Sequence, residues 1–372
     1  MPWEERSAMS SRLEFVELAL RDEVNVSELC RRFGVSRTVA YKWMDRYRMN
    51  GSAGLQNHSR RPHHSPGRTP HAMERAIVQM RTKHRAWGGE KIAWVLQRRG
   101  VVGVPDPRTV QNILKRHGLI DPAQTAAHRP CQRFEHPDPN DLLQMDFKGS
   151  VPTATVRCHP LSVLDDHSRF VMLLQACANE TTATVKKWLI TMLRRYGLPR
   201  CMLMDNGSPW GDDRDHPWTP LTVWMLRLGI AVSHGRPYHP QTQGKVERFH
   251  KTLKAEAITG RTFTDLRDCQ RHFDRFRQLY NCERPHKSLN KDVPMQHYRP
   301  SPRPYPEILP PFEYGPDDIV RAVHGSCISF QGQRCYIGRP FSGLPVAFRP
   351  TAVDGLFDIV FCHHVIKQID LR

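Results

Sequence analysis

Two proline-rich segments limit the fold of this chain more than any other feature of its sequence. They span residues 57–70, with the sequence NHSRRPHHSPGRTP, and residues 299–315, which begin RPSPRPYPEILPP. Proline has no backbone N–H and a fixed φ, so such segments cannot lie inside a helix or a central strand. A chain of 372 residues is long enough for two to four domains. We therefore expect several separately folded domains joined by these extended segments.

The regions that the proline-rich segments separate predict a multidomain chain with all-α, α/β and all-β parts. Residues 26–47 and 87–120 have helical periodicity, residues 140–298 alternate strand-like and helix-like runs, and the last part has short strands with glycine turns. The expected parts, in order, are a helix-turn-helix domain (1–56), a linker (57–70), a second helix-turn-helix-like domain (71–120), a linker (121–139), a central domain (140–298), a linker (299–315) and a small C-terminal domain (316–372).

The segment VSELCRRFGVSRTVAYKWMDRY (26–47) carries the signals of a helix-turn-helix. Gly34 permits a tight turn, Ser36 can cap the second helix, and Ala40 and Trp43 are expected on its buried face. In a bound helix-turn-helix, the exposed face of that helix enters the major groove. The residues predicted to contact DNA there are Arg37, Thr38, Tyr41 and Lys42. The alternative is an ordinary helical hairpin with a solvated face.

A second helical module, residues 87–120, repeats this pattern more loosely. Apolar residues follow one face of each of its helices, and Pro107 stands near the start of the last helix, where its missing N–H costs little. The exposed donors predicted to contact DNA are Arg108, Gln111 and Lys115. The alternative for this module is a packing role.

The charge of the chain favours nucleic acid as its partner. Lys and Arg number 55 against 37 Asp and Glu, which gives a net charge of +18 and a pI near 9.8. Such an excess suits double-stranded DNA or an anionic surface. No run of 18 apolar residues occurs, so no membrane partner is expected, and the ten scattered cysteines favour a reducing cytoplasm.

The central region carries three acidic residues on or beside its predicted strands and helices. Its pattern is three strands, a helix, a strand, a helix, a strand and a helix, which predicts a mixed sheet flanked by helices. Asp146 interrupts an apolar strand, Asp205 ends another, and Glu247 lies on a helix. A carboxylate in an apolar strand is costly unless it is paired or binds a metal. A buried structural aspartate is the alternative for each acid taken singly.

Phosphodiester chemistry explains why three such acids should come together. Two metal ions held by carboxylates activate an oxygen nucleophile and stabilise the leaving oxygen. Hard oxygen ligands beside phosphate favour two Mg²⁺ ions, with Mn²⁺ as a substitute. In this reading Asp146 bridges the ions, and Asp205 and Glu247 each hold one. Lys245, Lys251 and Lys254, in HPQTQGKVERFHKTLK (239–254), would bind the adjacent phosphates.

The sequence resembles the DDE transposases of small bacterial insertion sequences, which have a catalytic core of the retroviral integrase type. The segments that carry the resemblance cover nearly the full chain: ELCRRFGVSRTVAYKW, WGGEKI, LLQMDFKG, VLDDHSRF, LMDNGSPW, HPQTQGKVERFHKTLK and YNCERPHKSLNKDVP. The resemblance implies an RNase H-like core with Asp146, Asp205 and Glu247 as its catalytic triad, and an SH3-like β-barrel at the C-terminus. It also implies DNA cleavage with strand transfer, and a helix-turn-helix in place of the integrase zinc domain, so no zinc is expected.

One departure from the family leaves the second acid open. The interval between Asp205 and Glu247 is several residues longer than usual, and the excess is assigned to the polar loop 211–220. That loop carries three other acids, Asp212, Asp213 and Asp215, any of which is an alternative to Asp205. Asp165 and Asp166, by contrast, lie at an expected hairpin turn and are interpreted as structural.

These observations favour a transposase that binds the terminal inverted repeats of a mobile element, cleaves its ends and joins them to target DNA. Joining two ends requires at least a homodimer on DNA, and such a protein would work in the bacterial cytoplasm, associated with the nucleoid. Two other functions stay open: a nuclease of RNase H fold without strand transfer, and a domesticated sequence-specific DNA-binding regulator.

Overall fold

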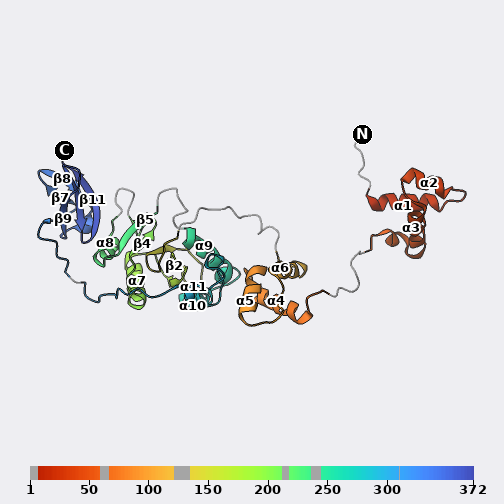
Figure 1. Cartoon of the computed structure of the whole chain (residues 1–372), viewed down its shortest axis with the longest axis horizontal. Helices are drawn as coiled ribbons and strands as arrows, with labels where there is room; N and C mark the ends of the chain where they lie inside the picture. The colour runs from red at the N-terminus through yellow and green to blue at the C-terminus, as the bar shows by residue number, and fades with distance from the viewer. Residues whose placement is uncertain (1–6, 59–66, 121–134, 212–217, 236–243, 310) are drawn as a thin grey trace. The chain divides into compact units, whose positions relative to one another are not determined.

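The computed structural model describes the chain except for residues 1–6, 59–66, 121–134, 212–217, 236–243 and 310. It separates into two compact units, Met1–Arg68 and Thr69–Arg372. Among the described residues, no helix is both long and apolar enough to cross a membrane. Figure 1 shows helices in the first unit and, in the second, helices, then strands interleaved with helices, and last a group of strands.

The first unit is a small helical domain containing a helix-turn-helix. Its elements are α1 (Ala8–Ala19), α2 (Val26–Phe33), α3 (Arg37–Asn50) and the 3₁₀ turn η1 (Gly51–Leu55). Gly34 ends α2 with φ of 65°, a conformation that glycine adopts at no steric cost. The Ser36 side chain accepts a hydrogen bond from the Val39 N–H, which confirms the predicted cap. Ala40 is buried as predicted, Trp43 is half-buried and packs against the same core, and Met44 is the other fully buried side chain of α3.

Three further helices form the second helical module, α4 (His71–Lys83), α5 (Gly89–Arg98) and α6 (Pro107–Arg116). Their core is built from Trp87 and the aliphatic faces of α5 and α6. The Asp106 side chain caps α6, and Pro107 occupies its first turn, as the sequence predicts.

A mixed five-stranded sheet forms the centre of the second unit, as predicted. Its strands are β1 (Leu142–Phe147), β2 (His159–Asp165), β3 (Val171–Cys177), β4 (Cys201–Met204) and β5 (Ala231–His234), in the order β3-β2-β1-β4-β5. β1 pairs antiparallel with β2 and parallel with β4, and β4 pairs parallel with β5. β1 is therefore the middle strand, flanked on both edges.

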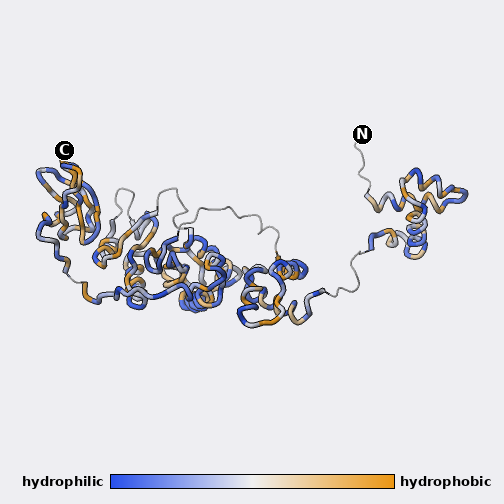
Figure 2. The backbone as a smooth tube through the Cα atoms, in the orientation of Figure 1, coloured by the Kyte–Doolittle hydropathy of each residue, from blue (hydrophilic) through white to orange (hydrophobic). Residues whose placement is uncertain are grey.

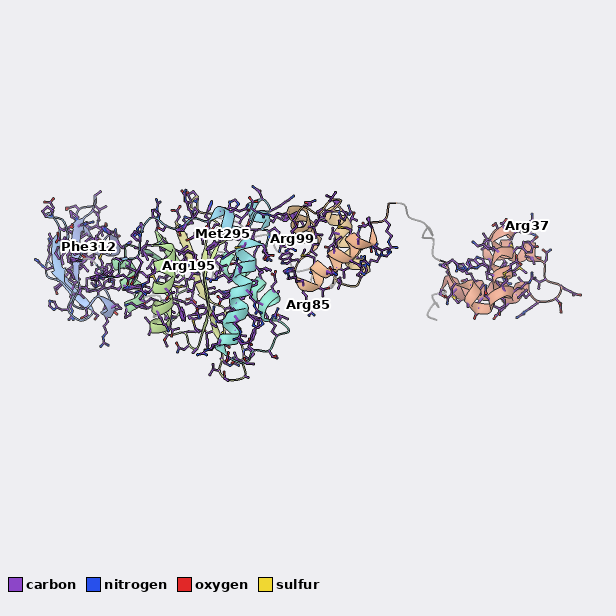
Figure 3. All side chains as sticks on the ribbon, turned by 90° about the horizontal axis from the view of Figure 1, so that it is seen from below. Arg37, Arg85, Arg99, Arg195, Met295 and Phe312 are labelled. Carbon is purple, nitrogen blue, oxygen red and sulfur yellow. The ribbon has the colours of Figure 1, made fainter. Side chains whose placement is uncertain are left out.

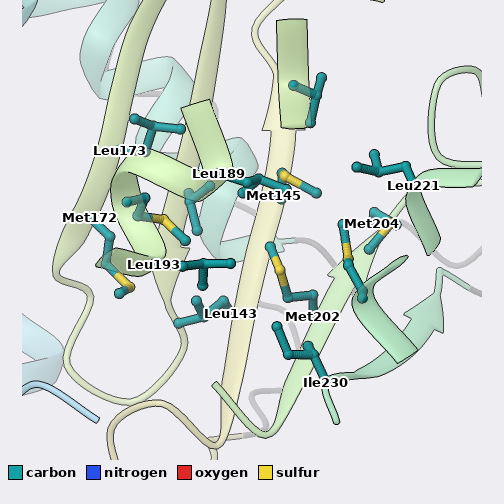
Figure 4. Close-up of a cluster of buried hydrophobic side chains, with 14 of the residues drawn as sticks. Leu143, Met145, Met172, Leu173, Leu189, Leu193, Met202, Met204, Leu221 and Ile230 are labelled. Carbon is teal, nitrogen blue, oxygen red and sulfur yellow. The ribbon is translucent and has the colours of Figure 1, made fainter. Parts of the chain in front are cut away.

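Helices cover both faces of this sheet. Leu143 and Met145 of β1 and Met202 and Met204 of β4 pack with side chains of α7 (Thr182–Tyr196) and α8 (Pro220–Arg227), and Figure 4 shows this core. The opposite face packs against α9 (Gly244–Leu253), its π-helical extension η4 (Lys254–Ile258) and α10 (Leu266–Cys282). Because side chains alternate along a strand, Gln144 and Asp146 of β1 lie on this second face. Figure 2 shows hydrophilic and hydrophobic stretches alternating along the chain, as such one-sided packing requires.

The C-terminal part is an antiparallel β structure. Its strands are β6 (Ile319–Ala322), β7 (Cys327–Phe330), β8 (Gln333–Tyr336), β9 (Pro345–Pro350), β10 (Leu356–Phe361) and β11 (His364–Asp370). Four of them form a sheet in the order β11-β10-β9-β6, and β7 and β8 form a separate hairpin. Phe330 of the hairpin stacks on Phe348 of the sheet with ring centroids 4.0 Å apart, so the two share one core. The sheets do not close, and the SH3-like barrel stays a prediction.

Short elements complete the second unit. They are the turn η5 (Lys287–Leu289), the helix α11 (Pro294–His297) and the turn η6 (Arg339–Phe341).

Candidate active site

Asp146 lies on the central strand, on the face covered by α9. It stands opposite Ser162 of β2 in the antiparallel register, and its neighbours Met145 and Phe147 point to the other face. The side chain is partly exposed, with 24% of its surface accessible. Asp146 is thus held by a rigid strand but is open to a ligand.

Asp205 follows directly after β4, the parallel neighbour of β1. The register pairs Gln144 with Leu203, so Asp205, two residues further on, reaches the same end of the sheet as Asp146. Its carboxylate accepts a hydrogen bond from the Gly207 N–H at 3.3 Å. Its carbonyl oxygen lies 2.8 Å from Nδ1 of His234 in β5. The parallel pairing therefore brings the first two predicted acids to the same end of the sheet.

The electrostatics of Asp146 show that the acids influence each other. Burial, together with the charges of Asp205 and Glu247 and against a backbone hydrogen bond from Phe147, raises the pKa of Asp146 from 3.8 to about 7. Burial also raises the pKa of Asp205. In the absence of a cation, the site therefore resists full ionisation.

Glu247 lies in the first turn of α9 and is half-buried. Lys251 of α9 and Lys254, the first residue of its extension η4, are exposed to solvent, as the sequence predicts. Lys245 lies differently from the expectation: its ammonium is 2.6 Å from Oδ2 of Asp166, and the side chain is only 16% exposed. That ammonium is engaged inside the protein.

His250, one turn after Glu247, is a neighbour of Asp146 that the sequence did not indicate. Its Nδ1 lies 3.6 Å from Oδ2 of Asp146, and its Nε2 lies 2.6 Å from Oγ of Ser162. The Ser162 hydroxyl donates to the Asp146 carbonyl oxygen at 3.0 Å, so it accepts from the imidazole. Burial, assisted by the charge of Lys148, lowers the pKa of His250 to about 3, which keeps the ring neutral. The only sequence signal for it was its spacing from Glu247.

Asp165 and Asp166 are fully buried at the turn between β2 and β3. Asp165 accepts hydrogen bonds from the Asn140 N–H at 2.8 Å and from the Ser168 N–H at 2.7 Å. Asp166 accepts from Gln144 as well as from Lys245. Both carboxylates lie at the end of the sheet opposite to Asp146 and Asp205.

The donor set suits a hard divalent cation. Asp146, Asp205 and Glu247 offer carboxylate oxygens, which Mg²⁺ and Mn²⁺ prefer, and a cation would offset the repulsion that raises the pKa of Asp146. Within the described part of the chain, no three His, Cys, Asp or Glu side chains are already gathered at metal-binding separation. The charges of these acids therefore influence one another, but their carboxylates do not form a closed coordination sphere.

Some predicted residues fall outside the structure's description. Asp212, Asp213 and Asp215, the alternatives to Asp205, are among them, as is most of the expected loop 239–244 that precedes α9. The choice between Asp205 and those acids therefore stays a prediction.

The first helix-turn-helix presents its predicted DNA-contact residues to solvent. Arg37, Thr38, Tyr41 and Lys42 are all exposed along α3, and Figure 3 labels Arg37 on this helix. Trp43 is half-buried, with the guanidinium of Arg12 4.0 Å from its ring centroid. The side of α3 that carries Arg37 and Lys42 is therefore both basic and accessible.

The second module presents a smaller basic surface on α6. Arg108 and Lys115 are exposed. Gln111 is exposed too, but its side-chain oxygen accepts a hydrogen bond from the Gly89 N–H at 2.9 Å and so ties α6 to the start of α5. The neighbouring Arg116 pairs with the buried Glu74 at 2.6 Å.

Comparison with family models assigns these parts. Residues 136–240 and 228–294 each match an integrase core domain, so the central domain has the RNase H-like fold of those cores. Residues 11–63 match a helix-turn-helix domain and residues 39–114 a homeodomain-like domain. Residues 318–372 match the C-terminal domain of IS481 family transposases.

Individual relatives agree with this assignment. Over 286 residues the chain is 22% identical to an uncharacterized 31.7 kDa protein of insertion element IS407 from Burkholderia multivorans, covering 75% of the chain and 92% of that protein. It is 33% identical over 137 residues, 37% of the chain, to the Pro-Pol polyprotein of simian foamy virus type 3. The chain spans only about a tenth of the length of the foamy-virus polyproteins that it matches: 11% of this one.

Solved structures that resemble the chain include retroviral integrases. One is a simian T-cell lymphotropic virus intasome in complex with a PP2A regulatory subunit, with 17% identity and a TM-score of 0.38 over 80% of this chain and 96% of the matched chain. Another is the HTLV-2 integrase catalytic core in complex with magnesium, with 14% identity and a TM-score of 0.33 over 44% of the chain and 99% of that core.

Proposed function

We propose that this chain, which is similar to insertion-sequence transposases with an integrase-type core, is the transposase of a bacterial mobile element. The observation that carries the proposal is the parallel pairing of β1 with β4, which puts Asp146 and Asp205 at the same end of the sheet, with the pKa of Asp146 raised by burial and by the charges of Asp205 and Glu247. Such clustered acids are costly in a protein that does not use them.

Asp146, Asp205 and Glu247 are the residues proposed to hold two Mg²⁺ ions, with Mn²⁺ as a substitute. Bound divalent ions supply activation of the attacking oxygen and neutralisation of charge on the phosphate. The strands fix the two aspartates, and α9 brings Glu247 to them from the covered face of the sheet. His250, on the same helix, lies beside Asp146, with its Nδ1 3.6 Å from Oδ2.

The reaction proposed for this site has two steps. A water oxygen attacks phosphorus at each element end, and the bond to the 3′-oxygen breaks, which frees a 3′-hydroxyl. That hydroxyl then attacks a target phosphorus and displaces the target 3′-oxygen, so the number of phosphodiester bonds is kept. No protein–DNA covalent intermediate is involved.

The helical modules supply the proposed binding to the terminal repeats. α3 would enter the major groove with Arg37, Thr38, Tyr41 and Lys42, and α6 would add Arg108, Gln111 and Lys115. Lys251 on α9 and Lys254 at the start of η4 can bind phosphates near the reacting bond. Two ends need two sites, so the working unit is at least a homodimer on DNA, associated with the bacterial nucleoid.

A Glu247→Gln variant tests this function. The amide keeps the size of the side chain and removes its negative charge, so cleavage of labelled element-end DNA in Mg²⁺ should disappear while end binding persists. Retained cleavage would refute the assignment. Nicking by the wild type without joining to a target would identify a nuclease instead. An Asp146→Asn protein that replaced the wild type in cells would identify a regulator.

A further inference from the structure

A buried polar network joins the start of α9 to the central strand. Gln144 of β1 donates from Nε2 to Oδ1 of Asp166 at 2.9 Å, and its Oε1 accepts the Val246 N–H at 3.1 Å. The Lys245 ammonium lies 2.6 Å from Oδ2 of Asp166 and donates to its carbonyl oxygen at 3.0 Å. Gln144 and Asp166 have no exposed surface. Three distant segments thus meet in one network of complementary donors and acceptors.

The contact to Val246 serves as a helix cap supplied by a strand. N–H groups in the first turn of a helix have no partner within the helix and usually bond to a capping side chain just before it. Here the partner of Val246 is Gln144, which belongs to β1. The position of the helix start is therefore tied to the strand that carries Asp146.

A second contact lies further along the same two elements. His250 of α9 reaches Asp146 at 3.6 Å, four residues after Val246, and Asp146 is two residues after Gln144. Four helical residues rise about 6 Å and two strand residues about 6.6 Å, so the spacings match when helix and strand run the same way. Glu247 lies between the two contacts. A shift of one residue would move α9 by about 1.5 Å and turn Glu247 by about 100°.

We propose that Gln144, Asp166 and Lys245 are positioning residues that hold α9 in register with β1, so that Glu247 meets Asp146 and Asp205. This inference rests on the proposed function, because it assigns a purpose to the placement of Glu247. Lys245 neutralises the buried Asp166, which in turn orients the Gln144 amide toward Val246. Lys245 thereby differs in role from the exposed Lys251 and Lys254.

Substitutions at both ends of the network test the inference. Lys245→Met removes the charge, Lys245→Arg keeps it, and Gln144→Met removes both amide hydrogen bonds at similar volume. Two matched controls are Asp165→Asn, a buried acid of the same turn with no hydrogen bond or ion pair to α9 among its described contacts, and Lys251→Met, an exposed lysine of the same helix. Each full-length variant is titrated with Mn²⁺ by calorimetry, and its affinity for element-end DNA is measured across salt concentrations.

Lys245→Met and Gln144→Met should weaken Mn²⁺ affinity by about 10- to 100-fold, the range seen when residues that orient metal ligands are changed. Their cleavage rate at saturating DNA should fall accordingly, while DNA affinity and its salt dependence stay unchanged. Lys245→Arg should recover part of the Mn²⁺ affinity. Lys251→Met should show the reverse pattern, with weaker DNA binding, a smaller salt slope and unchanged Mn²⁺ affinity.

Two results would overturn the inference. One is that Lys245→Met behaves like Lys251→Met, which would make Lys245 a phosphate contact. The other is that Lys245→Met and Gln144→Met lower only the melting temperature and have the same Mn²⁺ affinity as the control Asp165→Asn. If Lys245→Met fails to fold, Gln144→Met and Lys245→Arg decide. Glu247→Gln separates this failure from that of the proposed function: if Glu247→Gln binds Mn²⁺ like the wild type, the metal site itself is wrongly placed.

Discussion

Replacing Asp146 by asparagine should stabilise the metal-free protein at alkaline pH. The asparagine keeps the shape of the side chain but cannot ionise. In the wild type, burial on the central strand and the nearby charges of Asp205 and Glu247 raise the pKa of Asp146 from 3.8 to about 7. A group whose pKa is higher in the folded protein stabilises the fold most below its unfolded pKa. That contribution disappears as pH rises, here between about pH 4 and pH 7.

The size of the effect follows from the shift in pKa. One pKa unit corresponds to about 1.4 kcal/mol, so a shift of roughly three units makes Asp146→Asn more stable by at most about 4 kcal/mol at pH 8. At pH 5 most of the folded protein is already protonated at Asp146, and the advantage should be less than half as large. At pH 4 it should be below about 1 kcal/mol.

Thermal or urea unfolding in EDTA at pH 4, 5 and 8 measures this difference. For a domain of this size, each kcal/mol moves the melting temperature by about 2–4 °C. Adding Mg²⁺ at pH 8 should stabilise the wild type and leave Asp146→Asn unchanged, because a ligand stabilises only the state that binds it. An Asp146→Asn protein that is no more stable than the wild type at pH 8, or equally more stable at every pH, would refute the reasoning.

Three further outcomes follow from other parts of the structure. Arg37→Ala and Lys42→Ala should each weaken binding to element-end DNA, which fluorescence anisotropy measures. If the side chain binds one phosphate, its removal should reduce the slope of log affinity against log salt by about 0.9, and an unchanged slope would exclude a phosphate contact. Ser162→Ala leaves Nε2 of the buried His250 without its partner and should lower the unfolding free energy by about 1–3 kcal/mol in a urea titration, whereas an unchanged free energy would mean that water replaces the hydroxyl. Phe348→Ala removes a fully buried ring stacked on Phe330 and should cost about 3–5 kcal/mol; a melting curve unchanged in the C-terminal domain would contradict the shared core.

Local sequence signals predicted much of the fold. The order of strands and helices in the central domain is as expected, because each element has its own periodicity and turn residues. The Ser36 cap and the turn at Gly34 were likewise predictable, since both depend on neighbours within three residues. Asp146 and Asp205 lie at the same end of the sheet because β1 and β4, both recognisable as strands, pair in parallel.

Features that depend on tertiary packing were not predictable. The full burial of Met44 and the half-burial of Trp43 depend on where α1 lies, and the Arg12 side chain of α1 covers the Trp43 ring. Lysine is usually a surface residue, and only the turn at Asp166, far away in sequence, gives Lys245 a buried partner. His250 and Gln144 acquire their roles in the same way, from contacts between elements.

The order of the strands and helices along the chain decides when the central sheet and Glu247 become available during synthesis. β1, β2 and β3 are consecutive and pair with short connections, whereas β4 joins later and α9 later still. Chains emerge from the ribosome N-terminus first, and domains fold as they appear. On the proposed function, a nascent chain gains its DNA-binding helices long before Glu247 is made. A message cut short before α9 would thus encode a DNA binder without catalysis, able to occupy element ends and restrain its own full-length product.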